Sequence, residues 1–160
     1  MKSFVRSLFI LFAVLCVAEL AFANRQSIAI ALGGADTVAA DMTNATATGS
    51  VSVYSDGTVS VRGKGSLKIE NVDAKTLYVT LNTKKYSHYY TFSLYKTDDA
   101  SSINRVFVGK NRFIPGGDSI FGITSGGNLH SVTFEFDTHS LFTVNSITFN
   151  QKPPFSFNVV

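Results

Sequence analysis

The sequence predicts an all-β fold: an antiparallel β-sandwich of jelly-roll type, with about nine or ten strands after a cleaved signal peptide. Short segments that alternate apolar and polar residues recur roughly every ten residues, a rhythm typical of sandwiches and jelly rolls. Turn-forming residues separate these segments, and no convincing helical pattern follows the amino terminus. The chain has no internal repeat and no long linker, so we expect one domain over residues 24–160.

The amino terminus has the composition of a secretory signal peptide. Lys2 and Arg6 form a basic start, residues 8–18 are an apolar core, and a small-x-small cleavage site ends at Ala23. The apolar run is short for a membrane span. We therefore expect a mature chain without a transmembrane segment, secreted to the extracellular space, or to the periplasm or cell surface of a bacterium.

The composition restricts the chemistry of the mature chain. Cys16 is the only cysteine and lies in the signal, which leaves no disulfide, thiol nucleophile or thiolate metal site. The full chain has 14 basic and 11 acidic residues, and the signal contains two of the basic residues and one of the acidic ones. The mature chain therefore keeps 12 basic and 10 acidic residues. The basic residues are scattered apart from Lys84 and Lys85. A nucleic-acid-binding surface would cluster them on one face, so we expect no nucleic-acid partner.

Residues 50–63 predict a β-hairpin whose turn can be inferred. A two-residue loop would place the valines of its two arms on opposite faces, whereas a three-residue loop at residues 55–57 brings them to one face. Register follows the buried face, so we predict the three-residue loop, with Gly57 in the left-handed region. The predicted pairs are Val53 with Val59 and Val51 with Val61.

Other strands follow from the same alternation. Residues 27–32 (SIAIAL) predict a first strand, and residues 35–49 predict a loop or a weak edge strand. In residues 75–96 the inward set contains Leu77, Val79, Leu81, Phe92 and Leu94, and the outward set contains Thr76, Tyr78, Thr80, Tyr89, Ser93 and Tyr95. Further predicted strands cover residues 65–72, 103–109 and 155–159, with a polar turn at 97–102 and a Gly-rich loop at 117–128.

Residues 129–137 and 141–149 are the best-patterned pair of strands. In the first, Val132, Phe134 and Phe136 share one face. In the second, the apolar phase changes near Asn145–Ser146, which a β-bulge would explain. The alternative is a strand buried on both faces, which needs no bulge.

Three short motifs carry a family resemblance: Phe121-Gly122-Ile123-Thr124-Ser125, Val132-Thr133-Phe134 and Asn145-Ser146-Ile147-Thr148-Phe149. In this order they resemble the closing strands of secreted jelly-roll domains of the carbohydrate-binding-module and galactose-binding-like type. They are also similar to the tails of exported bacterial surface-sorted β-sandwich proteins. The resemblance implies the fold and transfers no ligand residues.

No catalytic motif accompanies these strands, so we expect a protein that is not an enzyme and has no cofactor. His88, His130 and His139 lie in different strands or loops, and we interpret them as surface residues. A structural calcium ion is an alternative for the aspartates, which we interpret as solvated turn residues. These aspartates are Asp98, Asp99, Asp118 and Asp137.

Three tyrosines are the candidate ligand-binding residues. Tyr78, Tyr89 and Tyr95 fall on the polar phase of strands that we expect to be neighbours, so their rings could form one platform for an extracellular glycan or a surface protein. A purely structural role is the main alternative, and a membrane-active, pore-forming-like β-protein is another, suggested by the Val/Ser alternation of the hairpin. Asn44 is a glycosylation site if the source is a eukaryote.

Overall fold

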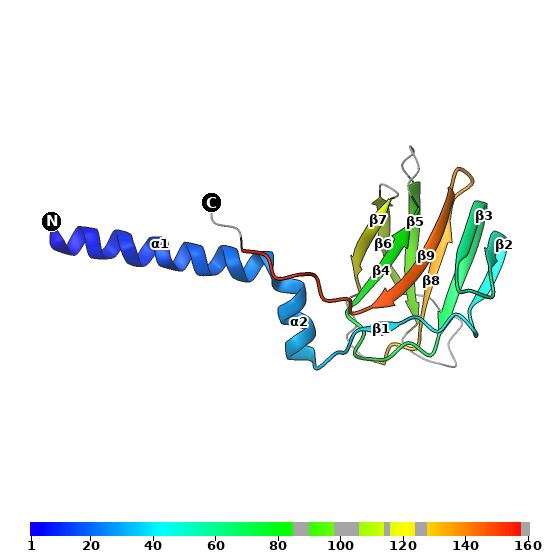
Figure 1. The fold of residues 1–160 in the computed structure, drawn as a ribbon, viewed down its shortest axis with the longest axis horizontal. Helices are drawn as coiled ribbons and strands as arrows, with labels where there is room; N and C mark the ends of the chain where they lie inside the picture. Colours follow the sequence, from blue (N-terminus) through cyan, green and yellow to red (C-terminus); the bar gives the residue numbers. More distant parts are fainter. Residues whose placement is uncertain (85–89, 98–105, 114–115, 124–127, 158–160) are drawn as a thin grey trace. The chain divides into compact units, whose positions relative to one another are not determined.

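The computed structural model describes residues 1–84, 90–97, 106–113, 116–123 and 128–157. The chain separates into two compact units. One contains Met1–Gly34 and the segment that starts at Lys152, and the other is Ala35–Gln151. The second unit is the β-sandwich (Figure 1). The predicted domain start at Asn24 depends on signal cleavage and stays a prediction.

The first unit begins with helix α1 (Lys2–Ala23), which has no buried residue. Its length and composition would allow it to cross a membrane, a property that signal sequences near the amino terminus share. Helix α2 (Arg25–Gly33) follows directly. Signal-peptide cleavage stays a prediction, with Ala23 as the last residue of α1.

The predicted strand at residues 27–32 is wrong, because this segment lies within α2. Both alternating sets in SIAIAL are apolar or small, so the period of two did not exclude a helix, and alanine is the best helix former. Gly34 ends the helix in the left-handed conformation (φ 61°), and its N–H bonds back to the carbonyls of Ile30 and Ala31. This glycine cap was the available sequence signal.

Asn24 joins the two segments of the first unit. It is 3% exposed, and its side-chain amide donates to the carbonyl of Ser156 at 2.8 Å. The backbone N–H of Ser156 donates to Asn24 Oδ1 at 2.9 Å. The described part of the predicted strand at 155–159 is not a strand. Two preceding prolines lack N–H donors, and Ser156 pairs with a side chain instead of a neighbouring strand.

The second unit confirms the predicted fold class. Every pairing between its strands is antiparallel, and the main order is β6-β5-β8-β3-β9-β4-β7, with β1 beside β9 and β2 beside β3. The described residues contain nine strands: β1 (Val38–Ala39), β2 (Thr46–Val53), β3 (Val59–Glu70), β4 (Tyr78–Thr83), β5 (Tyr90–Thr97), β6 (Val106–Phe113), β7 (Gly117–Gly122), β8 (Ser131–Phe136) and β9 (Leu141–Phe149). The Gly-rich loop predicted at 117–128 therefore begins with a strand.

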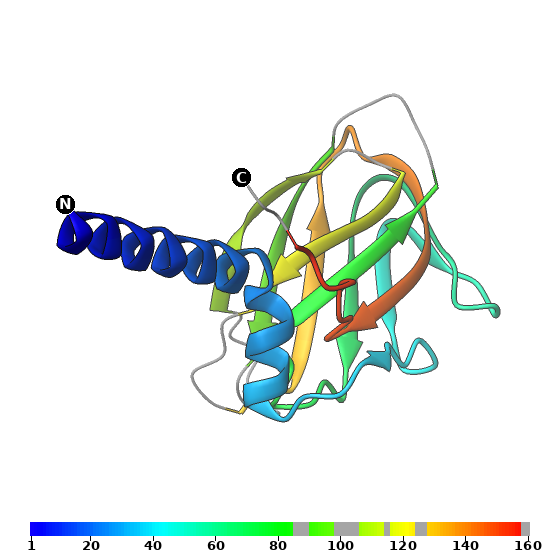
Figure 2. The same ribbon diagram turned by 60° about the vertical axis from the view of Figure 1, so that its left-hand side comes forward.

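Strand β3 belongs to both layers of the sandwich. Its first part, from Val59 to Arg62, pairs with β9, and its second part, from Gly65 to Glu70, pairs with β8. One layer is therefore β3-β9-β4-β7 and the other is β3-β8-β5-β6. Figures 1 and 2 show the long β2–β3 hairpin at one side of the sandwich, where the two layers meet. The predicted break between residues 63 and 65 is a bend within one strand.

Glycines make this bend possible. Gly49 (φ 65°) pairs with Gly65 next to a register shift between β2 and β3, and Gly63 (φ 137°) lies within the shifted part of β3, close to Ser50. A Cβ on Gly65 would lie 2.3 Å from the carbonyl oxygen of Thr48 and 2.8 Å from Val51. Side chains at this corner would separate the two strands, so the corner needs glycine.

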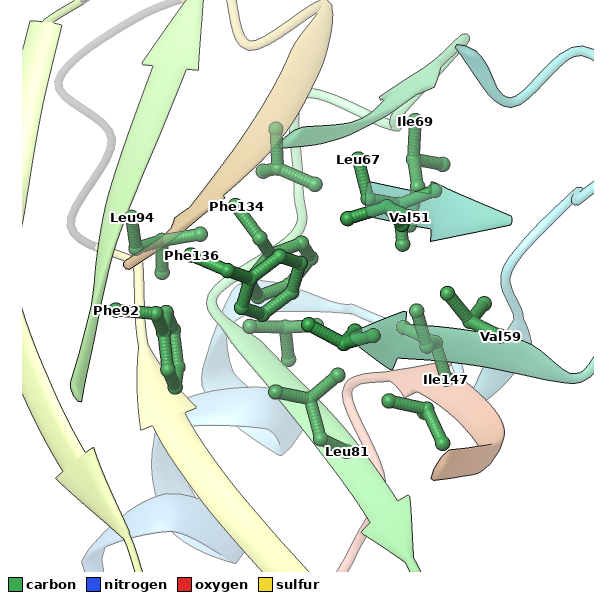
Figure 3. Packing of buried hydrophobic residues seen from close by; sticks show 14 of the residues in the cluster. Val51, Val59, Leu67, Ile69, Leu81, Phe92, Leu94, Phe134, Phe136 and Ile147 are labelled. Atoms are coloured by element: carbon green, nitrogen blue, oxygen red, sulfur yellow. The ribbon is translucent and has the colours of Figure 1, made fainter. Parts of the chain in front are cut away.

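The core fills the space between the layers (Figure 3). Aromatic rings cross it: Phe92 of β5 meets Phe121 of β7 edge-on at 5.1 Å, and Phe136 of β8 meets Phe142 of β9 at 5.4 Å. The most buried side chains include Val59, Val61, Leu67, Ile69, Val79, Leu81, Phe92, Leu94, Val132, Phe134, Phe142 and Val144. These are mainly the residues that alternation assigned to the inward faces.

Two predictions of register are confirmed. The hairpin pairs Val53 with Val59 and Val51 with Val61, and Gly57 has φ 84°. In β9 the register against β4 shifts at Asn145, which is the bulge, so the doubly buried alternative is wrong. The outer face of β8 differs from expectation, since Ser131 and Thr133 are also buried.

Candidate ligand-binding groove

Tyr78 and Tyr95, two of the three predicted tyrosines, do not lie on neighbouring strands. Tyr78 lies on β4 and Tyr95 on β5, and three strands, β8, β3 and β9, separate β4 from β5 in the sheet order. The expectation that these strands are neighbours is wrong, because the β8 and β9 strands from the end of the chain insert between them. Tyr89 lies outside the described residues. A ligand-binding role for each tyrosine stays a prediction.

The outward face of β4 is less open than predicted. Tyr78 is half-buried, and Thr76 and Thr80 are each 1% exposed. Leu77, predicted to be inward, is only half-buried. Farther along this face Asn82 donates to Asp118 at 2.7 Å and accepts from Asn145 at 3.0 Å. These polar groups are already occupied by one another.

The other predicted residues are dispersed. Asp118 accepts hydrogen bonds from side chains, and Asp137 accepts from the backbone of His139 in a turn. His130 is half-buried and His139 exposed. Asp98, Asp99 and His88 lie outside the described residues. Within the part of the chain that the structure describes, no three His, Cys, Asp or Glu residues gather as a metal site would require.

A groove of about 630 Å³ lies between the tip of the β2–β3 hairpin and the segment that precedes β2. We call it the hairpin groove. Its volume is in the range of small-molecule sites, roughly 300–1,000 Å³. The lining residues are Ala40, Asp41, Met42, Thr43, Ala45, Val53, Tyr54, Ser55, Asp56 and Gly57.

Local hydrogen bonds position both walls of the groove. On the hairpin side, Tyr54 and Thr58 close the three-residue loop, with the N–H of Tyr54 on the carbonyl of Thr58 at 2.9 Å. On the other side, the N–H of Ala40 donates to Ile147 of β9 at 2.9 Å, which fixes where the segment leaves the sandwich. Met42 then reaches the hairpin tip, since its Cγ would lie 3.9 Å from a Cβ on Gly57.

Each wall carries one Asp-x-Thr turn, and the two turns have the same geometry. Asp41 Oδ1 accepts from the backbone N–H of Thr43 at 3.0 Å and from its hydroxyl. Asp56 Oδ1 accepts from the backbone N–H of Thr58 at 2.9 Å and from its hydroxyl at 2.7 Å. Both carboxylates are therefore held in place at the groove by their own turns.

These hydrogen bonds favour the ionised form of both carboxylates. Side-chain and backbone bonds from Thr43 lower the pKa of Asp41, and those from Thr58 lower the pKa of Asp56, from an ordinary value of 3.8. Tyr54 adds an aromatic ring that is 50% exposed. The groove thus combines hydrogen-bond acceptors, an accessible ring and apolar lining residues that include Met42 and Val53.

Sequence reasoning missed Tyr54 and both aspartates as one site. The signal was present as two Asp-x-Thr repeats, DMT at residues 41–43 and DGT at 56–58. The two turns line one groove because residues 40–45 cross the edge of the sandwich, and the alternation of apolar and polar residues does not specify that path. Asn44, the predicted glycosylation residue, is exposed at this wall, where it donates weakly to Asp41.

A second cavity of about 300 Å³ lies at one end of the β8–β5 layer. It is lined by Lys64, Phe92, Ser93, Glu135, Phe136, Asp137 and Thr138. Phe92 is a core residue that is 1% exposed, and no tyrosine is among the lining residues. We therefore place the candidate site at the hairpin groove.

The fold is a jelly-roll β-sandwich, similar to that of solved carbohydrate-binding modules. The module CsCBM6-3 from Clostridium stercorarium, solved with cellobiose, matches with a TM-score of 0.52 and 13% identity, over 71% of this chain and 92% of that one. CBM35 from Paenibacillus barcinonensis matches with a TM-score of 0.54 and 13% identity, over 71% and 97%. A pectin-binding module matches with a TM-score of 0.54 and 13% identity, over 73% and 96%.

These similarities confirm the fold that the closing strands suggested. No protein-family model matches the sequence. No curated protein matches it either.

Proposed function

We propose that the mature chain is a secreted, non-catalytic protein that binds an extracellular glycan in the hairpin groove. The observation that carries the proposal is the exposed ring of Tyr54 beside two carboxylates held by their own turns. Sugars present apolar C–H faces ringed by hydroxyls. A flat aromatic ring suits the former, and ionised carboxylates accept hydrogen bonds from the latter.

The fold supports this proposal in a second way. One of the similar modules is solved in complex with cellobiose and another is a pectin-binding module, so the same architecture supports glycan recognition in other proteins. Because these modules are only 13% identical to this chain, the identity of its ligand has to be inferred from the residues of its own groove. We propose no cofactor, and an extracellular or surface location.

The structure gives no support to membrane insertion, the alternative that the Val/Ser alternation of the hairpin suggested. Three of the four valines on the apolar face of that hairpin, Val51, Val59 and Val61, are at most 5% exposed in the core of the sandwich, and the fourth, Val53, is half-buried. A membrane-inserting hairpin would need this face for lipid. A lipid-vesicle leakage assay on the secreted protein is expected to show no release of trapped dye.

A glycan array with the secreted protein tests the proposed function. Binding to at least one extracellular glycan is expected, and Tyr54→Ala should weaken it by on the order of 1–3 kcal/mol, by analogy with aromatic stacking on bases. The backbone bond of Tyr54 does not involve its ring, so the variant should melt near the wild-type temperature.

Tyr78→Ala and Tyr95→Ala are the matched controls, since both tyrosines lie on strands away from the groove lining. Unchanged binding by both supports the groove. Loss of binding in a control but not in Tyr54→Ala would move the site to that sheet face. A protein that binds no glycan would favour a structural role.

A further inference from the structure

We infer that the hairpin groove selects a glycan with protonated amino groups, such as a run of unsubstituted hexosamine units. The inference rests on the proposed function and concerns the charge of its ligand. It follows from which charged groups line the groove, which of their oxygens are unoccupied, and what the aromatic ring can contact.

The charge of the groove has one sign. Asp41 and Asp56 are the charged residues of its lining, and none of the other eight lining residues is basic. An anionic sugar, such as a uronic acid, would be repelled by both carboxylates. A neutral sugar would use them only as acceptors for hydroxyl groups.

Lys84 is a positive charge that partly offsets the negative charge of the groove. It lies near enough to Asp56 to lower its pKa, although this is the smallest of the contributing causes. Lys84 is exposed and is not part of the lining. One ammonium group outside the groove leaves the two carboxylates inside it with an excess of negative charge.

Each carboxylate keeps an oxygen for a ligand. The turn bonds occupy Oδ1 of Asp41 and of Asp56. Oδ2 of Asp41 accepts only the long 3.4 Å bond from Asn44, and Oδ2 of Asp56 accepts no hydrogen bond from the described residues. An ammonium group has three donors and no acceptor, so it matches these oxygens better than a hydroxyl does.

The ring of Tyr54 suits the same ligand. It is half exposed at the groove, and a cation over an aromatic face is attracted by the ring quadrupole. The C–H face of the same sugar can pack on the ring as well. The amine thus meets carboxylates and ring, while the sugar body meets Met42 and Val53.

Titration calorimetry on the secreted protein compares two oligosaccharides of equal length, one of glucosamine and one of N-acetylglucosamine. A preference of about tenfold for the free amine is expected, the effect of one charge-assisted hydrogen bond. The preference should shrink as salt is added, because the charges are near the surface. Asp56→Asn keeps the oxygen that Thr58 binds and removes the charge, so it should lower affinity for the amine only.

Asp73→Asn is the matched control. Asp73 makes the same kind of turn, accepting from the N–H of Lys75 at 2.8 Å, but lies outside the groove lining. It should leave both affinities unchanged. Equal affinities of the wild type for the two oligosaccharides would overturn the inference and leave the proposed function standing.

Two further outcomes would also overturn the inference. Absence of binding to any glycan removes the proposed function along with it. Tighter binding to oligolysine than to the amino oligosaccharide would instead assign the groove to a basic protein segment.

Discussion

Gly57 lies at the tip of the β2–β3 hairpin with φ 84°, a conformation that a β-branched residue adopts only under strain. Gly57→Val should lower the free energy of unfolding by about 1 kcal/mol or more. Urea denaturation measures the change. Ser55→Val is the control, since residue 55 of the same loop has no positive φ. Equal stability of the two variants would contradict the turn geometry.

Thr58 donates two hydrogen bonds to Asp56, from its hydroxyl and its backbone N–H, and both lower the pKa of Asp56. Thr58→Val removes the hydroxyl donor, so the pKa of Asp56 should rise toward its ordinary value, as an NMR titration would record. Because the pKa of Asp56 is lower in the folded state, its ionisation stabilises the fold at pH values above the ordinary pKa of an aspartate. That contribution is lost as the pH falls below about 4, through the folded-state pKa. The pKa of Asp41 should not change, because Thr43 holds it.

The sequence predicted the conformation and pairing of individual residues wherever these depend on a single pair of strands. The valines of the hairpin predicted its loop length and the left-handed Gly57. The apolar phase change predicted a bulge near Asn145–Ser146, and the structure has it at Asn145. The hairpin groove could not be predicted, because Asp41 and Asp56 approach each other only when residues 40–45 cross the sandwich edge.

Strand β3 is the element that changes layer, and Gly65 allows it. A Cβ at this position would meet the carbonyl oxygen of Thr48 at 2.3 Å, so one of the two backbones must move. Gly65→Ala should destabilise the sandwich by about 1–3 kcal/mol, the range for an overpacked site. Thermal unfolding measures it.

Gly122→Ala is the matched control for that corner. Its Cβ would lie 3.7 Å from the ring of Tyr78, an ordinary contact, and Gly122 has no positive φ. Tolerance of Gly65→Ala, with a melting temperature equal to that of Gly122→Ala, would argue against a tight corner.

Element type and element neighbours differed in how well they could be predicted. Strands β4, β5, β8 and β9 follow from alternation, since the apolar set that alternation assigned to the inward face of each strand is buried in the core. Strand order does not, because alternation carries no information about which distant strand pairs with which. For the same reason Tyr78 and Tyr95 were expected on neighbouring strands, although three strands separate β4 from β5. Helix α2 was missed because alanine fits both periods.

Processing concerns the whole molecule. Cleavage after Ala23 would remove α1 and make Asn24 the first residue, while the side chain of Asn24 keeps both hydrogen bonds to Ser156. Intact-mass measurement of the secreted protein is expected to give a chain that starts at Asn24. A secreted form that retains Met1 would contradict the signal-peptide prediction.

The bend in β3 also bears on how fast the molecule folds. The β2–β3 hairpin joins neighbours in sequence, and such hairpins form in about 1–10 μs. The strands that complete the two layers, β8 and β9, come from residues 131–149 and must find opposite ends of the same strand. Contacts so distant in sequence slow folding to the range of roughly milliseconds to seconds. Until β8 and β9 arrive, the two unpaired ends of β3 are the edge most exposed to pairing with another chain.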